Sequence, residues 1–240
     1  MGCDWYSGPL GSLLLARERK CLGEISVGLF GYQLLQVGRL GPDLDYLAEC
    51  PIRARVLIVP ATDDGASPSA CAEPERLPIA ADSIDALILP HTLDVAQDPR
   101  QVLREAERVL IPEGRLVLLG FNPWSLWGVR RLLSLRAAPP WSGNFIGYPR
   151  LNDWLSLLGF AVERTEVLMF RPPVAHAGLL DRLAFLDEYG PRFWPMLAGA
   201  YAVVAIKRVS TLTPIKLPWK RRSLIRAGVV QPSARGVPRG

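Results

Sequence analysis

The sequence has few cysteines, and their spacing excludes the common cysteine-based sites. The four cysteines, at positions 3, 21, 50 and 71, form no CxxC pair and have no nearby histidine. Such spacing argues against a zinc site, and a chain of 240 residues can fold without disulfides. We therefore expect reduced, mostly structural cysteines in a cytoplasmic protein. No metal-ligating cluster is predicted.

Long hydrophobic runs are also missing. The longest, such as residues 198–206, fall well short of the roughly 20 residues that a membrane-spanning helix needs. The N-terminus lacks a basic segment followed by an apolar stretch. These absences predict a protein that is neither secreted nor inserted in a membrane. The apolar content of 49% still supplies enough material for a buried core.

Acidic residues are absent from the C-terminal segment. The formal net charge of +5 would by itself favour a binder of nucleic acid or of membrane surfaces. From Lys207 onward, however, the chain has nine Lys and Arg and no acid, so residues 1–206 carry a net charge of −4. The sequence therefore predicts an acidic-leaning domain over residues 1–208 and a basic, proline-containing, poorly ordered tail over residues 209–240.

The basic tail supports one alternative partner, an RNA. Trp219 lies among the basic residues 216–222 and offers one stacking group. No interleaved aromatic series and no RNA-binding motif accompany it. A solvated tail is the favoured interpretation, and RNA contact through it stays the alternative.

Short apolar runs and helical patterns alternate along the chain. Strands are predicted at residues 33–37, 55–59, 84–89, 115–119, 160–169 and 200–207, as nearly continuous runs of apolar residues suggest. Helices are predicted at residues 13–30, 99–110, 126–135, 151–158 and 179–189, and residues 1–12 are expected to be irregular. The helix at 99–110 has Asp98 as its N-cap and Pro99 at its first position. This order predicts the α/β class.

The central stretch resembles a known family. It reads LPIAADSIDALIL at residues 77–89, then Pro90-His91, Asp98-Pro99 and RVLIPEGRL at residues 108–116. These forty residues resemble the class I S-adenosylmethionine-dependent methyltransferases, in particular the type 11 branch. The resemblance implies a Rossmann-like, seven-stranded, mostly parallel sheet with helices on both faces and a C-terminal antiparallel hairpin. It also implies S-adenosyl-L-methionine as cofactor, bound over the carboxyl ends of the strands.

The family's glycine-rich turn after the first strand is altered here. The resemblance implies that this turn contacts the methionine part of the cofactor, usually through an acid followed by Gly-x-Gly-x-Gly. Gln36 takes the position of the acid, Gly38 and Gly41 remain, and the middle glycine is lost. An ordinary strand-to-loop turn is the alternative. The resemblance also implies an acid after the second strand that binds the ribose hydroxyls of the cofactor, but residue 60 is proline. The acids at 63 and 64 either reach the ribose or lie in a solvated loop. The solvated loop is favoured.

Two further segments complete the implied site. Aligned on the LPF-like residues, Glu73, followed by Pro74, matches the acid that binds the adenine amino group. Leu89, Pro90 and His91 end the strand predicted at residues 84–89, and the resemblance implies that they lie beneath the methyl group of the cofactor. His91 has the chemistry of a general base, and a histidine that caps the loop through hydrogen bonds is the alternative.

The segment after the strand predicted at residues 115–119 is a candidate wall of the acceptor pocket. Aromatic faces and arginines bind flat or anionic groups, and this segment contains Asn122, Trp124, Trp127 and Arg130. A helix docked by its tryptophans is the alternative. His176, in a loop rich in proline and alanine, either lines a substrate entrance or faces solvent.

Together, these features predict an S-adenosylmethionine-dependent methyltransferase. A small-molecule acceptor is favoured over a protein or RNA, and no membrane partner is expected. Methyl transfer is an in-line displacement, so alignment of donor and acceptor can suffice without an obligatory catalytic side chain. The alternative is a methyltransferase-like binding module without catalytic activity, which the altered glycine turn favours.

Overall fold

One mixed sheet organises the domain. The computed structural model describes residues 3–40, 47, 50–60, 69–134, 140–174 and 176–208. The strand order is β3-β2-β1-β4-β5-β7-β6. Strands β1 to β5 pair in parallel, and β7 is antiparallel to both β5 and β6. The strands are β1 (Gln33–Val37), β2 (Ala54–Val59), β3 (Ala70–Cys71), β4 (Ile84–Pro90), β5 (Leu110–Phe121), β6 (Phe160–Leu168) and β7 (Ala200–Lys207).

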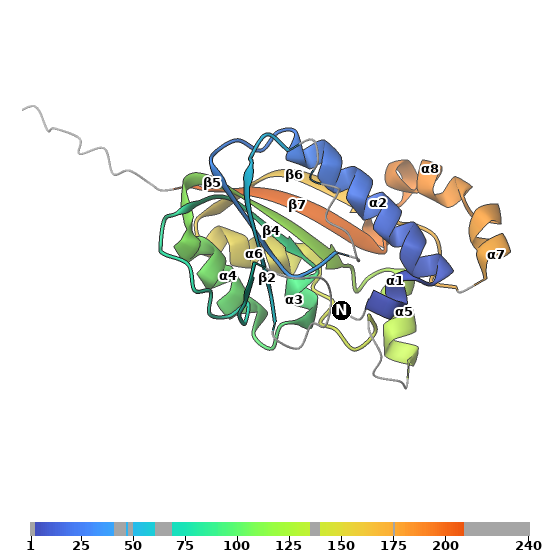
Figure 1. Cartoon of the computed structure of the whole chain (residues 1–240). Coiled ribbons are helices and arrows are strands. Elements are labelled where there is room, and N and C mark those ends of the chain that lie inside the picture. Colours follow the sequence, from blue (N-terminus) through green and yellow to red (C-terminus); the bar gives the residue numbers. More distant parts are fainter. Residues whose placement is uncertain are drawn as a thin grey trace, which may run out of the picture. The chain divides into compact units, whose positions relative to one another are not determined.

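Helices cover both faces of this sheet (Figure 1). Helix α2 packs on one face, whereas α4 and α6 pack on the other. The helices are α1 (Cys3–Tyr6), α2 (Pro9–Ser26), α3 (Thr92–Val95), α4 (Pro99–Val109), α5 (Leu126–Leu133), α6 (Tyr148–Leu157), α7 (Ala177–Arg182) and α8 (Phe185–Phe193), with a short 3-10 helix, η2 (Pro195–Leu197). The predicted Rossmann-like fold class is thereby confirmed.

Alternation of side chains along each strand gives the sheet two buried faces. On β1, Leu35 and Val37 join the cluster that includes the apolar residues of α4 and α6. Leu34 points the other way, into the cluster formed with α2. Both faces of β1 are therefore buried, which explains why its sequence is a nearly continuous apolar run.

Several elements match their predicted bounds. Strands β1 and β7 coincide with predictions 33–37 and 200–207. Helix α4 begins after Asp98, whose carboxylate accepts hydrogen bonds from the amides of Arg100 and Gln101. Local signals were sufficient to locate these elements: an N-cap and a proline at the first position for α4, and continuous apolar runs for the strands.

Three predictions of local structure were wrong, namely the irregular N-terminus, the end of the first helix and the single helix at 179–189, and one strand was missed. Residues 3–12 are largely helical rather than irregular, because Pro9 lies in the first turn of α2, where a missing N–H costs no hydrogen bond. Helix α2 also ends at Ser26 rather than at residue 30. The helix predicted at 179–189 is two helices, since Asp187 anchors α8 separately through the Phe170 amide and Arg171. Strand β3 was not predicted, because two residues leave no apolar run.

Some predictions fall on parts of the chain that the structure does not describe. These are the tail at residues 209–240 and the site candidates Gly41, Asp63 and Asp64. Within the described ranges, none of the helices combines the length and the apolar character that crossing a membrane requires.

Candidate functional site

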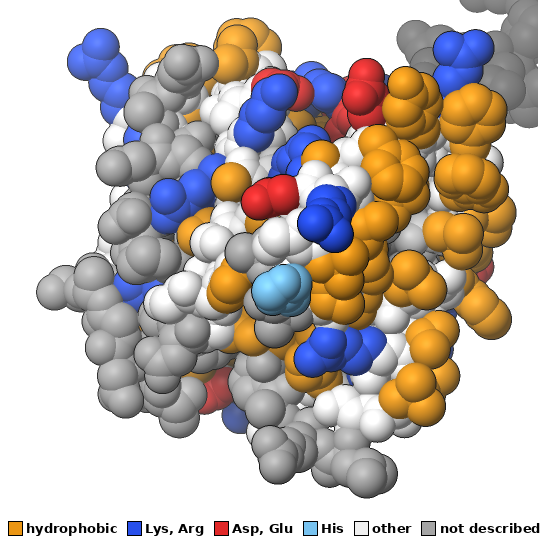
Figure 2. Space-filling model, turned by 90° about the vertical axis from the view of Figure 1, so that its right-hand side faces the viewer, with side chains coloured by type: hydrophobic (Ala, Val, Ile, Leu, Met, Phe, Trp, Pro, Cys, Tyr) orange, Lys and Arg blue, Asp and Glu red, His pale blue; other side chains and the backbone are white. Residues whose placement is uncertain are grey.

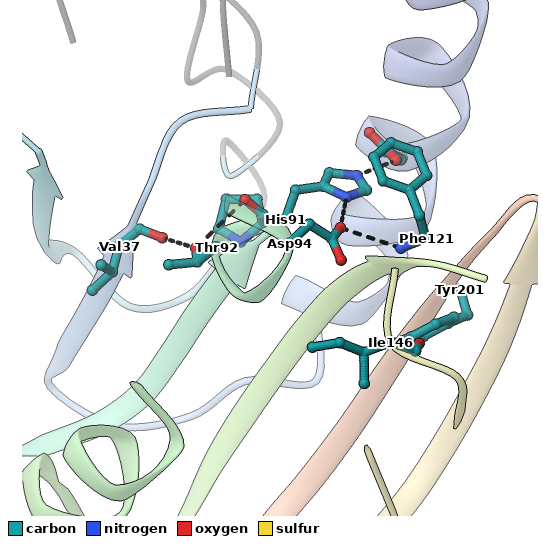
Figure 3. Close-up of polar contacts among 9 residues, drawn as sticks. Val37, His91, Thr92, Asp94, Phe121, Ile146 and Tyr201 are labelled. Carbon is teal, nitrogen blue, oxygen red and sulfur yellow. Dashed lines mark hydrogen bonds and ion pairs between the residues drawn. The ribbon is translucent and has the colours of Figure 1, made fainter. Parts of the chain in front are cut away.

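The carboxyl ends of β1 and β4 meet at a glycine turn. Gly38 follows β1 with a φ of 93°, and its amide donates a hydrogen bond to the carbonyl of Ile58 at 2.8 Å. The Thr92 hydroxyl, from the start of α3, donates to the carbonyl of Val37 (Figure 3). A Cβ at position 38 would lie 2.8 Å from Thr92 Oγ1. Both the backbone angle and the space thus require glycine.

Gln36 supports this turn rather than standing in for an acid. Its side chain is buried, and Nε2 donates a hydrogen bond to the carbonyl of Gly38 at 2.9 Å. A carboxylate at this position could not donate. Two residues after Gly38, Leu40 is fully buried in the cluster beneath α2. The side chain of Leu40 thus packs behind the turn, in the segment where the resemblance implies a further glycine.

The two acids of the loop after β3, Glu73 and Glu75, differ in their contacts. The amide of Ala72 donates to the carbonyl of Val59, which brings the following residues to the carboxyl end of β2. Glu73 is exposed, and its carboxylate makes no hydrogen bond or ion pair within the described part of the chain, whereas Pro74 is buried. Glu75 is used differently, since its Oε1 accepts from the amides of Gln97 and Asp98. Of these two acids, Glu73 is the one available to a ligand.

His91 lies at the end of β4 in a buried ionic cluster. Its backbone has a φ of 53°, and the side chain is only 2% exposed. Nδ1 is 2.7 Å from Asp94 Oδ2, and Nε2 is 2.7 Å from Glu18 Oε1 of α2. The ring stacks on Phe121, whose amide also donates to Asp94 Oδ2. Figure 3 shows His91 and Asp94 directed toward each other above the end of β5.

The electrostatics of this cluster keep His91 charged. Burial favours the neutral ring, but the two carboxylates outweigh it and raise the pKa of His91 to about 10. Burial raises the pKa of Asp94 to about 6, against the lowering effect of His91 and of the Phe121 amide. A protonated imidazole with both nitrogens engaged cannot accept a proton from a substrate. The geometry favours the alternative of a histidine that holds the loop.

Each acid of the cluster keeps one oxygen without a partner. Glu18 Oε2 and Asp94 Oδ1 are buried and have no hydrogen bond among the described residues. Burying carboxylates in this way is costly unless a cation lies beside them. His91 is that cation, so the cluster holds α2, β4 and α3 together only while the ring is protonated.

Sequence reasoning missed Glu18. Glu18 stands in a run of charged residues, between Arg17 and Arg19, which is typical of a solvated helix face, yet it is completely buried. A signal was present, because Glu18 lies four residues after Leu14 and four before Leu22, on the apolar stripe of α2. An acid on such a stripe indicates a buried cationic partner.

The predicted acceptor wall divides into structural and exposed parts. The side-chain Nδ2 of Asn122 donates to the carbonyls of Met196 and Ala198. Trp127 is buried, and its Nε1 donates to the carbonyl of Arg171 at 3.0 Å. These contacts support the alternative of a segment docked by a tryptophan.

Two other residues of this segment remain accessible. Arg130 donates to the carbonyl of Pro173 and lies over the ring of Trp141, 5.0 Å from its centroid. Trp124 is 73% exposed. Of the predicted wall, Trp124 and Arg130 can therefore contact a ligand. Leu89 and Pro90 are buried, and the side chain of Leu89 belongs to the core cluster of α4 and α6.

Comparison with known proteins agrees with this architecture. Residues 54–118 match the family described as "Methyltransferase domain". The chain is 34% identical over 215 residues to the uncharacterized protein YafS of Escherichia coli (strain K12), covering 88% of this chain and 84% of YafS.

Two solved structures share the fold. An S-adenosylmethionine-dependent methyltransferase from Thermotoga maritima superposes with a TM-score of 0.60 at 15% identity, covering 85% of this chain and 94% of that one. The [4+2]-cyclase SpnF superposes with a TM-score of 0.52 at 18% identity, covering 80% of each chain.

Fold and family define the class. The seven-stranded sheet and the methyltransferase domain are those of the class I S-adenosylmethionine-dependent methyltransferases, whose cofactor is S-adenosylmethionine. Within this class, the chain belongs to the same family as YafS.

Proposed function

We propose that the protein transfers a methyl group from S-adenosylmethionine to a small-molecule acceptor at the carboxyl ends of β1 to β4. The observation that carries this proposal is the turn at Gly38, where a positive φ and the nearby Thr92 hydroxyl leave room for no side chain. Such a turn lets a ligand approach the backbone closely. It lies at the edge of the sheet where open α/β folds bind their ligands.

The residues present fit the cofactor in a modified way. The backbone at Gly38 is the proposed contact for its methionine part, with Gln36 fixing the orientation of the Gly38 carbonyl. The exposed carboxylate of Glu73 is the proposed acceptor for the adenine amino group.

Catalysis in this proposal rests on alignment. S-adenosylmethionine supplies a methyl group that is already activated for displacement. The chain's own contribution is to bind donor and acceptor in line, and Trp124 and Arg130 are the accessible side chains that would orient the acceptor. His91 is not proposed as a general base, because both ring nitrogens are bound to carboxylates.

Calorimetric titration of the full chain with S-adenosylhomocysteine tests the donor site. Wild type is expected to bind, and Glu73→Ala to bind about tenfold more weakly after loss of one hydrogen bond to a charged group. Glu188→Ala, which removes an exposed acid from α8, is the matched control and should bind like wild type. Absence of heat and of a thermal shift at millimolar ligand would overturn the proposal in favour of a binding module that lost its donor.

A second experiment separates methyl transfer from other chemistry on this fold. The fold that this chain shares with SpnF also serves a cyclase, so donor binding alone does not establish transfer. Incubation with S-adenosylmethionine and a small-molecule library should yield S-adenosylhomocysteine together with an acceptor heavier by one methylene unit. Binding without turnover across acceptor classes would favour the non-catalytic alternative.

A further inference from the structure

An exposed apolar surface lies on the face of the molecule that carries α5, α8 and η2. Figure 2 shows hydrophobic side chains gathered in a band along this face, with Lys and Arg side chains among and beside them. We call it the aromatic face. Its members are Trp124, Leu126, Val129, Leu132, Leu133, Phe185, Tyr189, Phe193, Trp194, Met196 and Leu197, each about half exposed or more.

The two parts of the aromatic face are joined by hydrogen bonds. The side-chain Nδ2 of Asn122, shortly before α5, donates to the carbonyl of Met196 in η2 and to that of Ala198 directly after it. The ring of Trp127 in α5 lies against Gly199, where a Cβ would be 2.6 Å from the indole. The surface is therefore continuous and fixed, because its halves hold each other in place.

Helix α8 presents its apolar side chains outward. Only Gly190 of this helix is buried, and the helix is anchored through the polar contacts of Asp187 with Arg171 and Arg17. A helix of a soluble domain normally buries its apolar stripe. Contiguous exposed apolar area of this kind marks a binding surface.

The charges of the aromatic face identify its partner. Residues 122–134 contain no acid, and Arg130 of α5, Arg182 of α7 and Arg192 of α8 are exposed. The exposed acids of α7 and α8 are Asp181 and Glu188. An anionic bilayer offers both an apolar layer and negative charge.

We propose that the aromatic face docks on the surface of an anionic lipid bilayer. Trp, Tyr and Phe side chains are suited to the boundary between head groups and acyl chains, and arginines beside them contact lipid phosphates. This binding is peripheral, so it differs from the sequence-based expectation of no membrane partner, which rested on the lack of a membrane-spanning run. It does not depend on the proposed methyl transfer, although Trp124 and Arg130 also belong to the proposed acceptor wall.

Flotation of the full chain with vesicles tests this proposal. Vesicles of phosphatidylcholine with phosphatidylglycerol should carry the protein upward, and vesicles of phosphatidylcholine alone should carry much less. The double variant Phe193→Ser/Trp194→Ser should lower the partition coefficient at least about tenfold, since two exposed aromatic side chains are removed. Leu132→Ser/Leu133→Ser should lower it as well, because α5 belongs to the same surface.

A matched control removes the same number of aromatic side chains from the other end of the sheet. Phe30 and Tyr32 are exposed and precede the amino end of β1. Phe30→Ser/Tyr32→Ser should float like wild type. Three results would overturn the proposal: no flotation of wild type with anionic vesicles, equal losses in the test and control variants, or a wild-type dimer that Phe193→Ser/Trp194→Ser converts to a monomer. Urea unfolding confirms that each variant is folded.

Discussion

Glu18 and His91 are 73 residues apart in the chain, yet Glu18 Oε1 lies 2.7 Å from His91 Nε2, and both side chains are buried. This pair connects α2, which covers one face of the sheet, to the end of β4, where the candidate site begins. Attachment of the N-terminal helix is thereby coupled to the shape of the loop that carries Thr92.

Replacement of Glu18 by glutamine should destabilise the fold. The change keeps the size of the side chain but leaves the buried His91 cation with only Asp94 as a charged partner. Loss of one member of a buried ion pair costs about 3–5 kcal/mol. Urea unfolding measures the change. Glu24→Gln, an exposed acid on the same helix, is the control and should alter stability by less than about 0.5 kcal/mol. Equal stabilities of the two variants would contradict the buried pair.

Stability should fall as the pH rises from about 6.5 to about 10. The pKa of His91 is raised from 6.5 to about 10 in the folded protein, so the folded state holds the proton more tightly than the unfolded state. Its contribution is complete below pH 6.5 and is lost as the pH passes through 10. The loss across this window is on the order of 3–5 kcal/mol. Asp94, with its pKa raised to about 6, acts in the same direction below that pH.

Two measurements check this pH dependence. Urea unfolding at several pH values should give a slope in wild type that His91→Gln lacks. Nuclear magnetic resonance of the imidazole ring of His91 should show it protonated at pH 8, and His176 is the only other histidine in the sequence, which makes assignment simple. A His91 ring that loses its proton near pH 6.5 would contradict the ion pairs.

Alanine at position 38 should abolish tight donor binding without unfolding the domain. The new Cβ would meet Thr92 Oγ1 at 2.8 Å, and a φ of 93° is strained for any residue but glycine. Calorimetry with S-adenosylhomocysteine is expected to show at least a tenfold loss. Gly178→Ala is the control, because a Cβ there has ordinary space and no positive φ. Unchanged affinity in Gly38→Ala would remove this turn from the donor site.

Replacement of Gln36 by glutamate should destabilise the fold and weaken donor binding. In Gln36→Glu the carboxylate cannot donate to the Gly38 carbonyl and would face it in a buried position. The expected cost is about 1–3 kcal/mol in urea unfolding. Donor affinity is expected to fall as well. Gln36→Ala serves as a companion variant, since it removes the donor without adding charge. Tighter donor binding by Gln36→Glu would mean that Gln36 is merely a lost acid.

The fold was predictable because its signals are local or repeated. Continuous apolar runs located the six longer strands, and Asp98 and Pro99 marked the start of α4. Strand β3 gave no signal, since two residues form no pattern. The roles of site residues were harder to predict, because they depend on contacts between segments far apart in the chain.

His91 and Gln36 illustrate that difficulty. An unperturbed histidine titrates near neutral pH, so the residue type alone suggested a general base. Its protonated state depends on Glu18, 73 residues away, which no local pattern connects to it. The amide of Gln36 acts on a carbonyl two residues away, but only the bend at Gly38 brings the two together. The roles of Glu73 and Trp124 toward a ligand stay predictions.

The position of β7 has a consequence for biosynthesis. This last strand inserts between β5 and β6 and pairs antiparallel with both. A nascent chain that has emerged only to residue 199 contains Gly38, Glu73 and His91, yet β5 and β6 still lack their common partner. Completion of the sheet must therefore wait until residues 200–207 leave the ribosome, and premature termination before them would release a chain with two unpaired strand edges that are prone to aggregate.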